Sequence, residues 1–216
     1  MSTCILIPCK GLRDGKSRLS ACLGAAARYD LCKRLLERTL HCASDVLPAG
    51  QIRLVTTDPE AMALARRHAI GTIIDPGLGL NAALEHARDH LLADLPPAGP
   101  DLLVLPIDLP FVTSQCIADV LARAGDCAIA PDEAGTGTNL LYVRSAAPHA
   151  VPFAFGGGSY AAHLAFAQSH ALTVSTFQDW RLAFDLDNPA DYESWRTGVH
   201  PGSIWRRASP TRVARY

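Results

Sequence analysis

The chain has 216 residues, of which 49% are hydrophobic, and its formal net charge is -1. This size and composition fit one α/β domain with its own core. The balanced charge gives no overall basic field, so neither nucleic acid nor a membrane is an expected partner.

Cysteine usage and the start of the chain bear on its location. The seven cysteines are an odd number without a Cys-x-x-Cys pair, which argues against a zinc site and a disulfide framework. The first eight residues lack the basic start and the apolar length of a secretory signal. We therefore expect a cytoplasmic protein whose cysteines are small buried side chains.

Short apolar runs alternate with helical patterns, which predicts crossover units around a mostly parallel sheet. The expected strands are Cys4–Pro8, Ile52–Thr57, Leu102–Ile107, Cys127–Ala130, Leu140–Val143 and Leu182–Leu186. The expected helices are Ala25–Ser44, Pro59–His68, Asn81–Leu92, Ser114–Ala124 and Ala161–His170. Asp58 is an expected N-cap, as is Thr113 or Ser114. The fold class is therefore α/β, with a mostly parallel central sheet flanked by helices.

The periodic pattern ends after Trp195. We expect residues 1–196 to form the single domain and residues 197–216 to form a basic, poorly ordered C-terminal tail. The arginines of this tail are Arg206, Arg207, Arg212 and Arg215.

Three acids close apolar runs of strand length. Asp108 closes the run that begins at residue 101, and Asp185 and Asp187 close the run that begins at residue 182. Acids at the C-terminal ends of parallel strands face the crevice where open α/β sheets bind ligands. Residues two apart on a strand share a face at about 6.6 Å, so this pair could hold one metal or bridge two. The alternative is local turn and cap roles; we predict a divalent-metal site.

The first strand runs into a glycine-containing basic loop, residues 8–19. Its cations are Lys10, Arg13, Lys16 and Arg18. Gly11 and Gly15 let backbone N–H groups approach phosphate, and the cations offset polyphosphate charge. The loop is not a Walker A motif, because Lys10 stands where that motif requires glycine. We expect this loop to bind the triphosphate of a nucleotide; the alternative is a basic loop that is only solvated.

A second glycine-containing segment, residues 75–81, leads into a helix. Its glycines permit a base or ribose to approach, and Asn81 offers a donor and an acceptor to a purine edge. A turn with Asn81 as the N-cap is an equal alternative, and both can hold.

Residues 135–139 and 155–160 are candidates for binding an acceptor anion. Ser159 stands where the N-cap of the following helix is expected, so that helix start would attract a carboxylate or phosphate. His163 lies one turn further on and could line the same pocket, although a packed or solvent-facing histidine is favoured.

Six motifs occur together in this chain: Pro8-x-Lys10 followed by Asp14-Gly-Lys-Ser-Arg-Leu19, Gly77-Leu-Gly-Leu-Asn81, Pro106-x-Asp108-Leu-Pro110, Gly135-Thr-Gly-Thr-Asn139, Phe155-Gly-x-Gly-Ser159 followed by His163, and Asp185-x-Asp187-x-Pro189-x-Asp191. Their set and order resemble the CofC family, the phospholactate or phosphoenolpyruvate guanylyltransferases of coenzyme F-420 biosynthesis. The resemblance spans residues 3–195. It departs from the family pattern at Gly15, where a small residue such as alanine is usual, and at Cys9, where valine is commoner.

The resemblance implies a nucleotide-diphospho-sugar transferase fold of the GT-A-like, Rossmann-related type. The implied reaction moves GMP from GTP to the phosphate of a small three-carbon phospho-acid and releases pyrophosphate, with Mg²⁺ as cofactor. Implied metal ligands are Asp108, Asp185 and Asp187. Implied nucleotide-binding residues are Pro8, Lys10, Lys16, Arg18, Gly79, Leu80 and Asn81, and implied acceptor-binding residues are Thr138, Gly156 and Ser159. The implied catalytic residues are Lys16, Arg18 and Asp108.

Several readings stay open at this point. The acceptor could be 2-phospho-L-lactate, phosphoenolpyruvate or 3-phosphoglycerate, which differ by a hydroxyl, a double bond or the position of the phosphate. A nucleotidyltransferase with another small acceptor, such as a sugar phosphate or a molybdenum-cofactor precursor, is the alternative enzyme. A non-catalytic GTP-binding protein is the alternative from another class. The sequence also leaves open whether the chain forms a homodimer.

Overall fold

A computed structural model of the chain describes residues 2–94, 99–145, 151–198 and 212–215. The strands are β1 (Thr3–Pro8), β2 (Ile52–Val55), β3 (Gly71–Ile73), β4 (Asp101–Val104), β5 (Cys127–Pro131), β6 (Thr138–Val143), β7 (Val174–Gln178) and β8 (Arg212–Arg215). The α-helices are α1 (Ala25–Ser44), α2 (Pro59–Arg67), α3 (Leu80–Asp94), α4 (Ser114–Arg123), α5 (Ser159–Ser169), α6 (Trp180–Ala183) and α7 (Pro189–Thr197). Two short 3-10 helices are η1 (Ser17–Ala21) and η2 (Ala49–Gln51).

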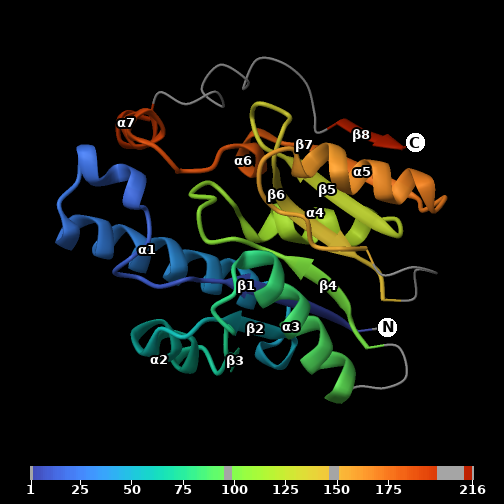
Figure 1. The fold of residues 1–216 in the computed structure, drawn as a ribbon, viewed down its shortest axis with the longest axis horizontal. Helices are drawn as coiled ribbons and strands as arrows, with labels where there is room; N and C mark the ends of the chain where they lie inside the picture. Colours follow the sequence, from blue (N-terminus) through green and yellow to red (C-terminus); the bar gives the residue numbers. More distant parts are fainter. Residues whose placement is uncertain (1, 95–98, 146–150, 199–211, 216) are drawn as a thin grey trace.

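The strands form one sheet in the order β3-β2-β1-β4-β6-β5-β7-β8. β1 pairs in parallel with β2 and β4, and parallel pairing also joins β2 to β3 and β5 to β7. β6 is antiparallel to both β4 and β5, and β8 is antiparallel to β7. β1 starts near the N mark of Figure 1 and runs toward the side on which α7 lies. The expected mostly parallel sheet is confirmed.

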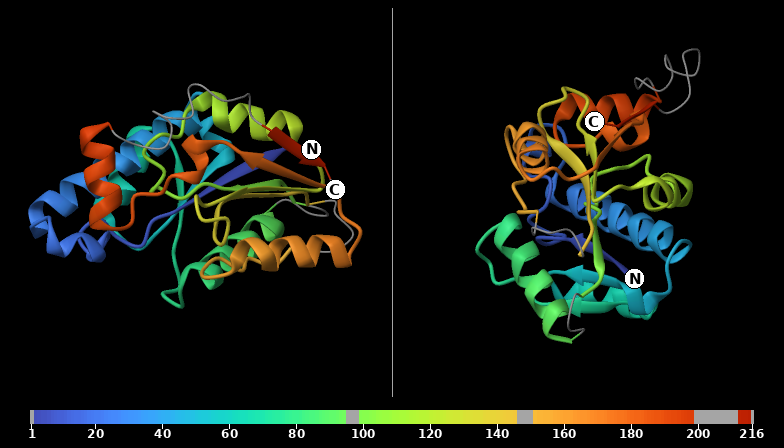
Figure 2. Two further views of the ribbon diagram at one scale, coloured as in Figure 1. Left: turned by 90° about the horizontal axis from the view of Figure 1, so that it is seen from above. Right: turned by 90° about the vertical axis from the view of Figure 1, so that its right-hand side faces the viewer.

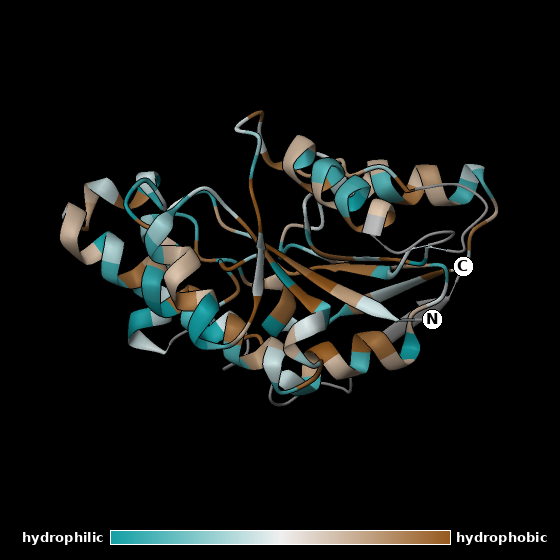
Figure 3. Ribbon diagram, turned by 90° about the horizontal axis from the view of Figure 1, so that it is seen from below, coloured by the Kyte–Doolittle hydropathy of each residue, from teal (hydrophilic) through white to brown (hydrophobic). Residues whose placement is uncertain are grey.

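Helices cover both faces of this sheet. In the left view of Figure 2, α3 and α5 lie on one side and α1 and α4 on the other. Alternate residues of β1 divide between the two layers: Ile5 and Ile7 pack in the cluster with α1, α2 and α4, whereas Leu6 packs in the cluster with α3 and α5. Figure 3 shows the apolar strands between these layers. Burial on both faces explains why the strands read as continuous apolar runs.

The helix and strand predictions up to residue 143 are confirmed apart from their ends, and α1 has the predicted bounds. The N-caps are confirmed as well: the Asp58 side chain accepts hydrogen bonds from the N–H groups of Glu60 and Ala61, and Thr113 accepts one from Cys116. The short edge strand β3 and the strand β7 were not predicted. The cysteines are free and buried except Cys22, which is exposed against expectation.

The predicted strand Leu182–Leu186 is wrong. Asp179 caps α6 by accepting the Arg181 N–H, and residues 184–187 then have no regular structure. The strand that precedes α6 is β7, which pairs in parallel with β5.

Most of the predicted tail lies outside the described residues, including Arg206 and Arg207; within it, residues 212–215 form β8, which was not predicted. In the described part of the chain, none of the helices combines the length and apolar character that a bilayer crossing requires.

Candidate active site

The loop after β1 is held in a defined shape. Asp58 Oδ2 accepts the Leu12 N–H at 2.7 Å, so the residue that caps α2 also fixes this loop. A Cβ atom on Gly15 would lie 2.7 Å from Cys32 Sγ and 3.0 Å from the Gly11 carbonyl oxygen. Glycine at position 15 therefore accommodates the thiol beneath the loop, which gives the departure from the family pattern a physical reason.

Lys16 turns from this loop toward the acids. Its backbone is left-handed, with φ 53° and ψ 39°, and directly precedes η1. The Lys16 ammonium lies 3.3 Å from Asp108 Oδ2 and 3.0 Å from Asp187 Oδ1, and its side chain is only 8% exposed. Burial opposes the charged form, but the two carboxylates outweigh it and raise the pKa of Lys16, which keeps the ammonium charged. Lys16 thus joins three distant parts of the chain.

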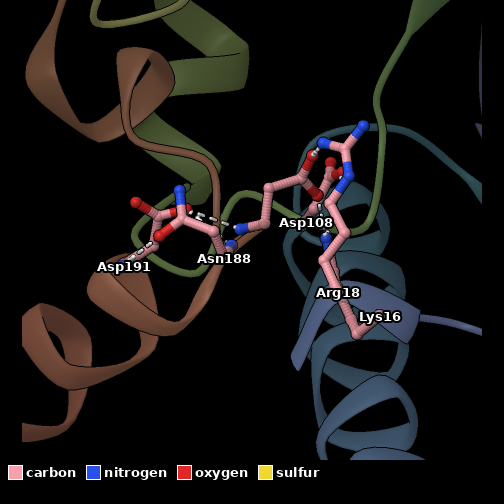
Figure 4. Close-up of polar contacts among 6 residues, drawn as sticks. Lys16, Arg18, Asp108, Asn188 and Asp191 are labelled. Carbon is pink, nitrogen blue, oxygen red and sulfur yellow. Dashed lines mark hydrogen bonds and ion pairs between the residues drawn. The ribbon is translucent and has the colours of Figure 1, made fainter. Parts of the chain in front are cut away.

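Arg18 reaches the same group of acids from the solvent side. Its guanidinium donates to Asp187 Oδ2 at 3.1 Å, and its side chain is 76% exposed. Figure 4 shows Arg18, from η1, and Lys16, from the residue before it, on the same side as Asp108. The predicted basic loop and the predicted acids are therefore brought together, with one buried cation and one exposed cation.

Asp185 and Asp187 alternate with buried apolar residues although their segment is not a strand. Phe184 and Leu186 pack in one cluster with Leu19 of η1. The Leu186 N–H donates to the Asp108 carbonyl oxygen at 2.9 Å, which ties this segment to the loop after β4. The prediction of a strand was wrong, but the alternation is real: Phe184 and Leu186 are buried, whereas Asp185 and Asp187 are only partly buried.

The acids repel one another. Burial raises the pKa of Asp185 to about 6, and the charges of Asp108 and Asp187 add to this effect. In the described part of the chain, no group of three or more His, Cys, Asp or Glu side chains is arranged to hold a metal ion, and the Lys16 ammonium contacts two of the three predicted ligands instead. The predicted metal roles stay a prediction.

Two residues without a predicted role hold the acidic segment. Asn139 Nδ2 donates to the Leu182 and Ala183 carbonyl oxygens at 3.1 and 2.9 Å, which fixes the end of α6. Asp191 Oδ2 accepts the N–H groups of Asp187 and Asn188, both at 2.9 Å, and Figure 4 shows Asp191 beside Asn188. Both residues belong to the motifs that carry the family resemblance, which was the only signal in the sequence.

The predicted acceptor-binding residues lie at the same edge of the sheet. β6 pairs with β4 from Leu102↔Val143 to Val104↔Leu141. Because β6 is antiparallel to β4 and begins at Thr138, this residue lies at the edge of the sheet where β4 ends. The Thr138 N–H donates to Ser159 Oγ at 2.8 Å, and the Ser159 N–H donates to the Gly156 carbonyl oxygen at 3.2 Å.

The prediction that Ser159 is the N-cap of α5 is wrong. The N-cap is Gly158, with φ 77°. A residue in the left-handed conformation ends the loop, and glycine adopts that conformation without strain. The Ser159 side chain instead faces β6 and is 1% exposed. It serves as a link between strand and helix.

Asn81 is likewise engaged within the protein. Its Nδ2 donates to the Phe155 carbonyl oxygen at 3.1 Å and its Oδ1 accepts the Phe155 N–H at 2.8 Å. It lies inside α3, so the alternative of an N-cap is wrong. This pairing joins the segment of Gly79 and Leu80 to the loop that contains Gly156. Two predicted nucleotide-binding residues remain. Pro8 is the last residue of β1, and Lys10 lies two residues after it.

Comparison with known proteins places this site in a family. The family described as "Guanylyl transferase CofC like" matches residues 3–195. A phosphoenolpyruvate guanylyltransferase from Rubrobacter xylanophilus is 38% identical over 200 residues, which cover 88% of this chain and 92% of the relative. A 2-phospho-L-lactate guanylyltransferase from Methanocella arvoryzae is 30% identical over 177 residues, which cover 82% of this chain and 72% of the relative.

The fold is similar to that of a solved structure from Desulfovibrio desulfuricans G20, which is described provisionally as a nucleotide-diphospho-sugar transferase. The TM-score is 0.66, the sequence identity is 21%, and the superposition covers 97% of this chain and 92% of that chain. The solved structure shows the fold, and the family match and the named relatives define the class, which is that of nucleotidyltransferase enzymes. The chain belongs to the CofC family of guanylyltransferases.

Proposed function

We propose that this chain transfers GMP from GTP to the phosphate of a small phosphorylated three-carbon acid and releases pyrophosphate, as a step in coenzyme F-420 biosynthesis. The observation that carries the proposal is the contact of Lys16, from the loop after β1, with Asp108 and Asp187 at the C-terminal edge of the sheet. This contact places a cation suited to binding a polyphosphate beside acids suited to binding a divalent metal ion.

The chemistry requires little acid–base catalysis. The acceptor is already a phosphate, so its oxygen is a nucleophile at neutral pH, and the obstacle is repulsion between two polyanions. Lys16 and Arg18 offset this repulsion and stabilise the departing pyrophosphate. Because Lys16 is nearly enclosed, its charge acts with less screening by water than that of Arg18.

The donor set fits magnesium. Carboxylate oxygens are preferred ligands of Mg²⁺. Burial, and after it the charges of Asp108 and Asp187, raise the pKa of Asp185, and a divalent cation beside these acids would offset both effects. Asp108, Asp185 and Asp187 would hold the ion. When bound, Mg²⁺ would neutralise phosphate charge and orient the reacting groups.

We assign Gly79 and Leu80 to the nucleoside, and Thr138, Gly156 and Ser159 to the acceptor; the pairing of Asn81 with the Phe155 backbone holds these two groups next to each other. Phosphoenolpyruvate is the acceptor we place first, because the relative named for that substrate is 38% identical and the relative named for 2-phospho-L-lactate is 30% identical.

Pyrophosphate release tests this proposal. Purified protein is incubated with Mg²⁺, with GTP, ATP or CTP, and with phosphoenolpyruvate, 2-phospho-L-lactate or 3-phosphoglycerate. We expect release with GTP and with phosphoenolpyruvate above the other acids. Asp108→Asn should lower the rate at least about 100-fold, whereas Asp119→Asn, on α4, serves as the matched control with wild-type turnover. Equal inactivity of the wild-type protein with all three acids would overturn the proposal.

A further inference from the structure

A buried histidine adjoins the acceptor side of the site and has no role in the proposed function so far. His163 lies on α5 and has no exposed surface. Its ring meets Phe155 edge to face, with the ring centroids 5.5 Å apart. Burial lowers the pKa of His163 to about 4, so the imidazole is neutral near pH 7.

The hydrogen bonds of His163 determine which ring nitrogen carries the proton. The Ala154 N–H donates to His163 Nε2 at 3.1 Å. A backbone amide can only donate, so Nε2 must be the unprotonated nitrogen. A neutral imidazole has one N–H group, which is therefore at Nδ1.

This tautomer fixes the direction of the next hydrogen bond. His163 Nδ1 lies 2.9 Å from Thr138 Oγ1, so the ring donates and the threonine hydroxyl accepts. A hydroxyl has one hydrogen and two lone pairs. Because a lone pair takes the bond from His163, the Thr138 hydrogen is left to donate to another group.

We propose that His163 is a positioning residue: by donating from Nδ1 it makes the Thr138 hydroxyl a hydrogen-bond donor to an anionic oxygen of the phospho-acid acceptor. With the opposite tautomer, Thr138 would donate to His163 and present lone pairs to an anion, which repel it. The inference rests on the proposed function, because the acceptor is the anion that this donor recognises. The Thr138 N–H donates to Ser159 Oγ, which holds the backbone of Thr138 beside the start of α5.

Two substitutions separate the two hydrogen bonds of the ring. In His163→Asn, the side-chain amide nitrogen takes the place of Nδ1 and retains the donor to Thr138. In His163→Gln, the side-chain amide takes the place of Nε2 and retains a partner for the Ala154 N–H but loses the donor. Both variants are polar and remove the ring, so each controls for the loss of packing in the other.

We expect His163→Gln to raise the KM for phosphoenolpyruvate at least about tenfold, the effect of losing one hydrogen bond to a charged group, with the KM for GTP within about twofold of wild type. His163→Asn should stay closer to wild type. Thr138→Val should raise the KM for the acceptor as much as His163→Gln does. The double variant with both Thr138→Val and His163→Gln should raise this KM no further. Equal effects of the Asn and Gln variants, or an added loss in the double variant, would overturn the inference.

Nitrogen-15 NMR of the histidine rings in the full-length protein gives a readout that does not need turnover. We expect the His163 signals of a neutral ring protonated at Nδ1. A ring protonated at Nε2 would overturn the role of His163 while leaving the proposed function intact. Absence of turnover with every acid, beside the expected tautomer, would instead overturn the proposed function and with it the acceptor part of this inference.

Discussion

Replacing Asn139 with leucine probes how the acidic segment is held. The side chains are similar in size, but leucine cannot make the two hydrogen bonds from Nδ2 to the Leu182 and Ala183 carbonyl oxygens, at 3.1 and 2.9 Å. Each bond contributes about 1 kcal/mol, and carbonyl groups left without a partner add to the cost. We expect the free energy of unfolding to fall by about 2–4 kcal/mol.

The same substitution should lower activity beyond its effect on stability. α6 ends at Ala183, two residues before Asp185, so loosening the end of α6 moves a proposed metal ligand. Urea titration measures the free energy of unfolding, and pyrophosphate release well below the melting temperature measures kcat. We expect kcat to fall at least about tenfold, because small misplacements of catalytic groups are costly.

Ser175→Ala is the matched control for Asn139→Leu. Ser175 is buried near the start of β7, away from the site, and its Oγ donates to the Arg123 carbonyl oxygen at 2.9 Å. Its loss should cost about 1 kcal/mol of stability without a change in kcat. Wild-type kcat in a destabilised Asn139→Leu variant would refute the reasoning.

Three further predictions concern single side chains. Gly15→Ala should cost about 1–3 kcal/mol of stability, because its Cβ would lie 2.7 Å from Cys32 Sγ and 3.0 Å from the Gly11 carbonyl oxygen. Cys32→Ala in the same chain removes the first contact and should recover part of this loss, so that the two losses are less than additive; additive losses in urea titration would contradict this. Burial lowers the pKa of His163 from 6.5 to about 4, so the unfolded chain binds the proton more tightly, and stability present above pH 6.5 should be lost as the pH falls toward 4. His163→Asn should remove about 2–3 kcal/mol of the fall in the free energy of unfolding between pH 6.5 and pH 4. The same pH dependence in the variant and the wild type would contradict this. Lys16→Met should lower kcat at least about 100-fold in the pyrophosphate assay, since the enclosed cation is lost, and wild-type turnover would exclude its role.

The fold was predictable where apolar runs were long and regular. α1 repeats leucines at helical spacing, and β1 is an unbroken apolar run buried on both faces. β7 was missed because its buried Ser175 and Thr176 interrupt the apolar pattern. Residues 182–186 were misassigned because the alternation of Phe184 and Leu186 with acids also arises when an extended segment packs against a neighbouring helix.

The position of the site was predictable, but its internal contacts were not. Asp108 and Lys16 each follow a parallel strand, and the C-terminal ends of such strands share one edge, so their approach follows from topology. The pairing of Asn81 with the Phe155 backbone joins residues 74 positions apart, and no local pattern encodes it. The same holds for the bond of Ser159 to Thr138, which overrides the local preference of serine for an N-cap.

Binding of Mn²⁺, a paramagnetic substitute for Mg²⁺, tests the central claim that acids from distant parts of the chain hold a metal beside Lys16. Electron paramagnetic resonance measures the Mn²⁺ affinity of the full-length protein with a non-hydrolysable GTP analogue. Asp185→Asn should weaken Mn²⁺ binding at least about tenfold relative to the wild type and to Asp119→Asn. Equal affinity in all three proteins would contradict the account.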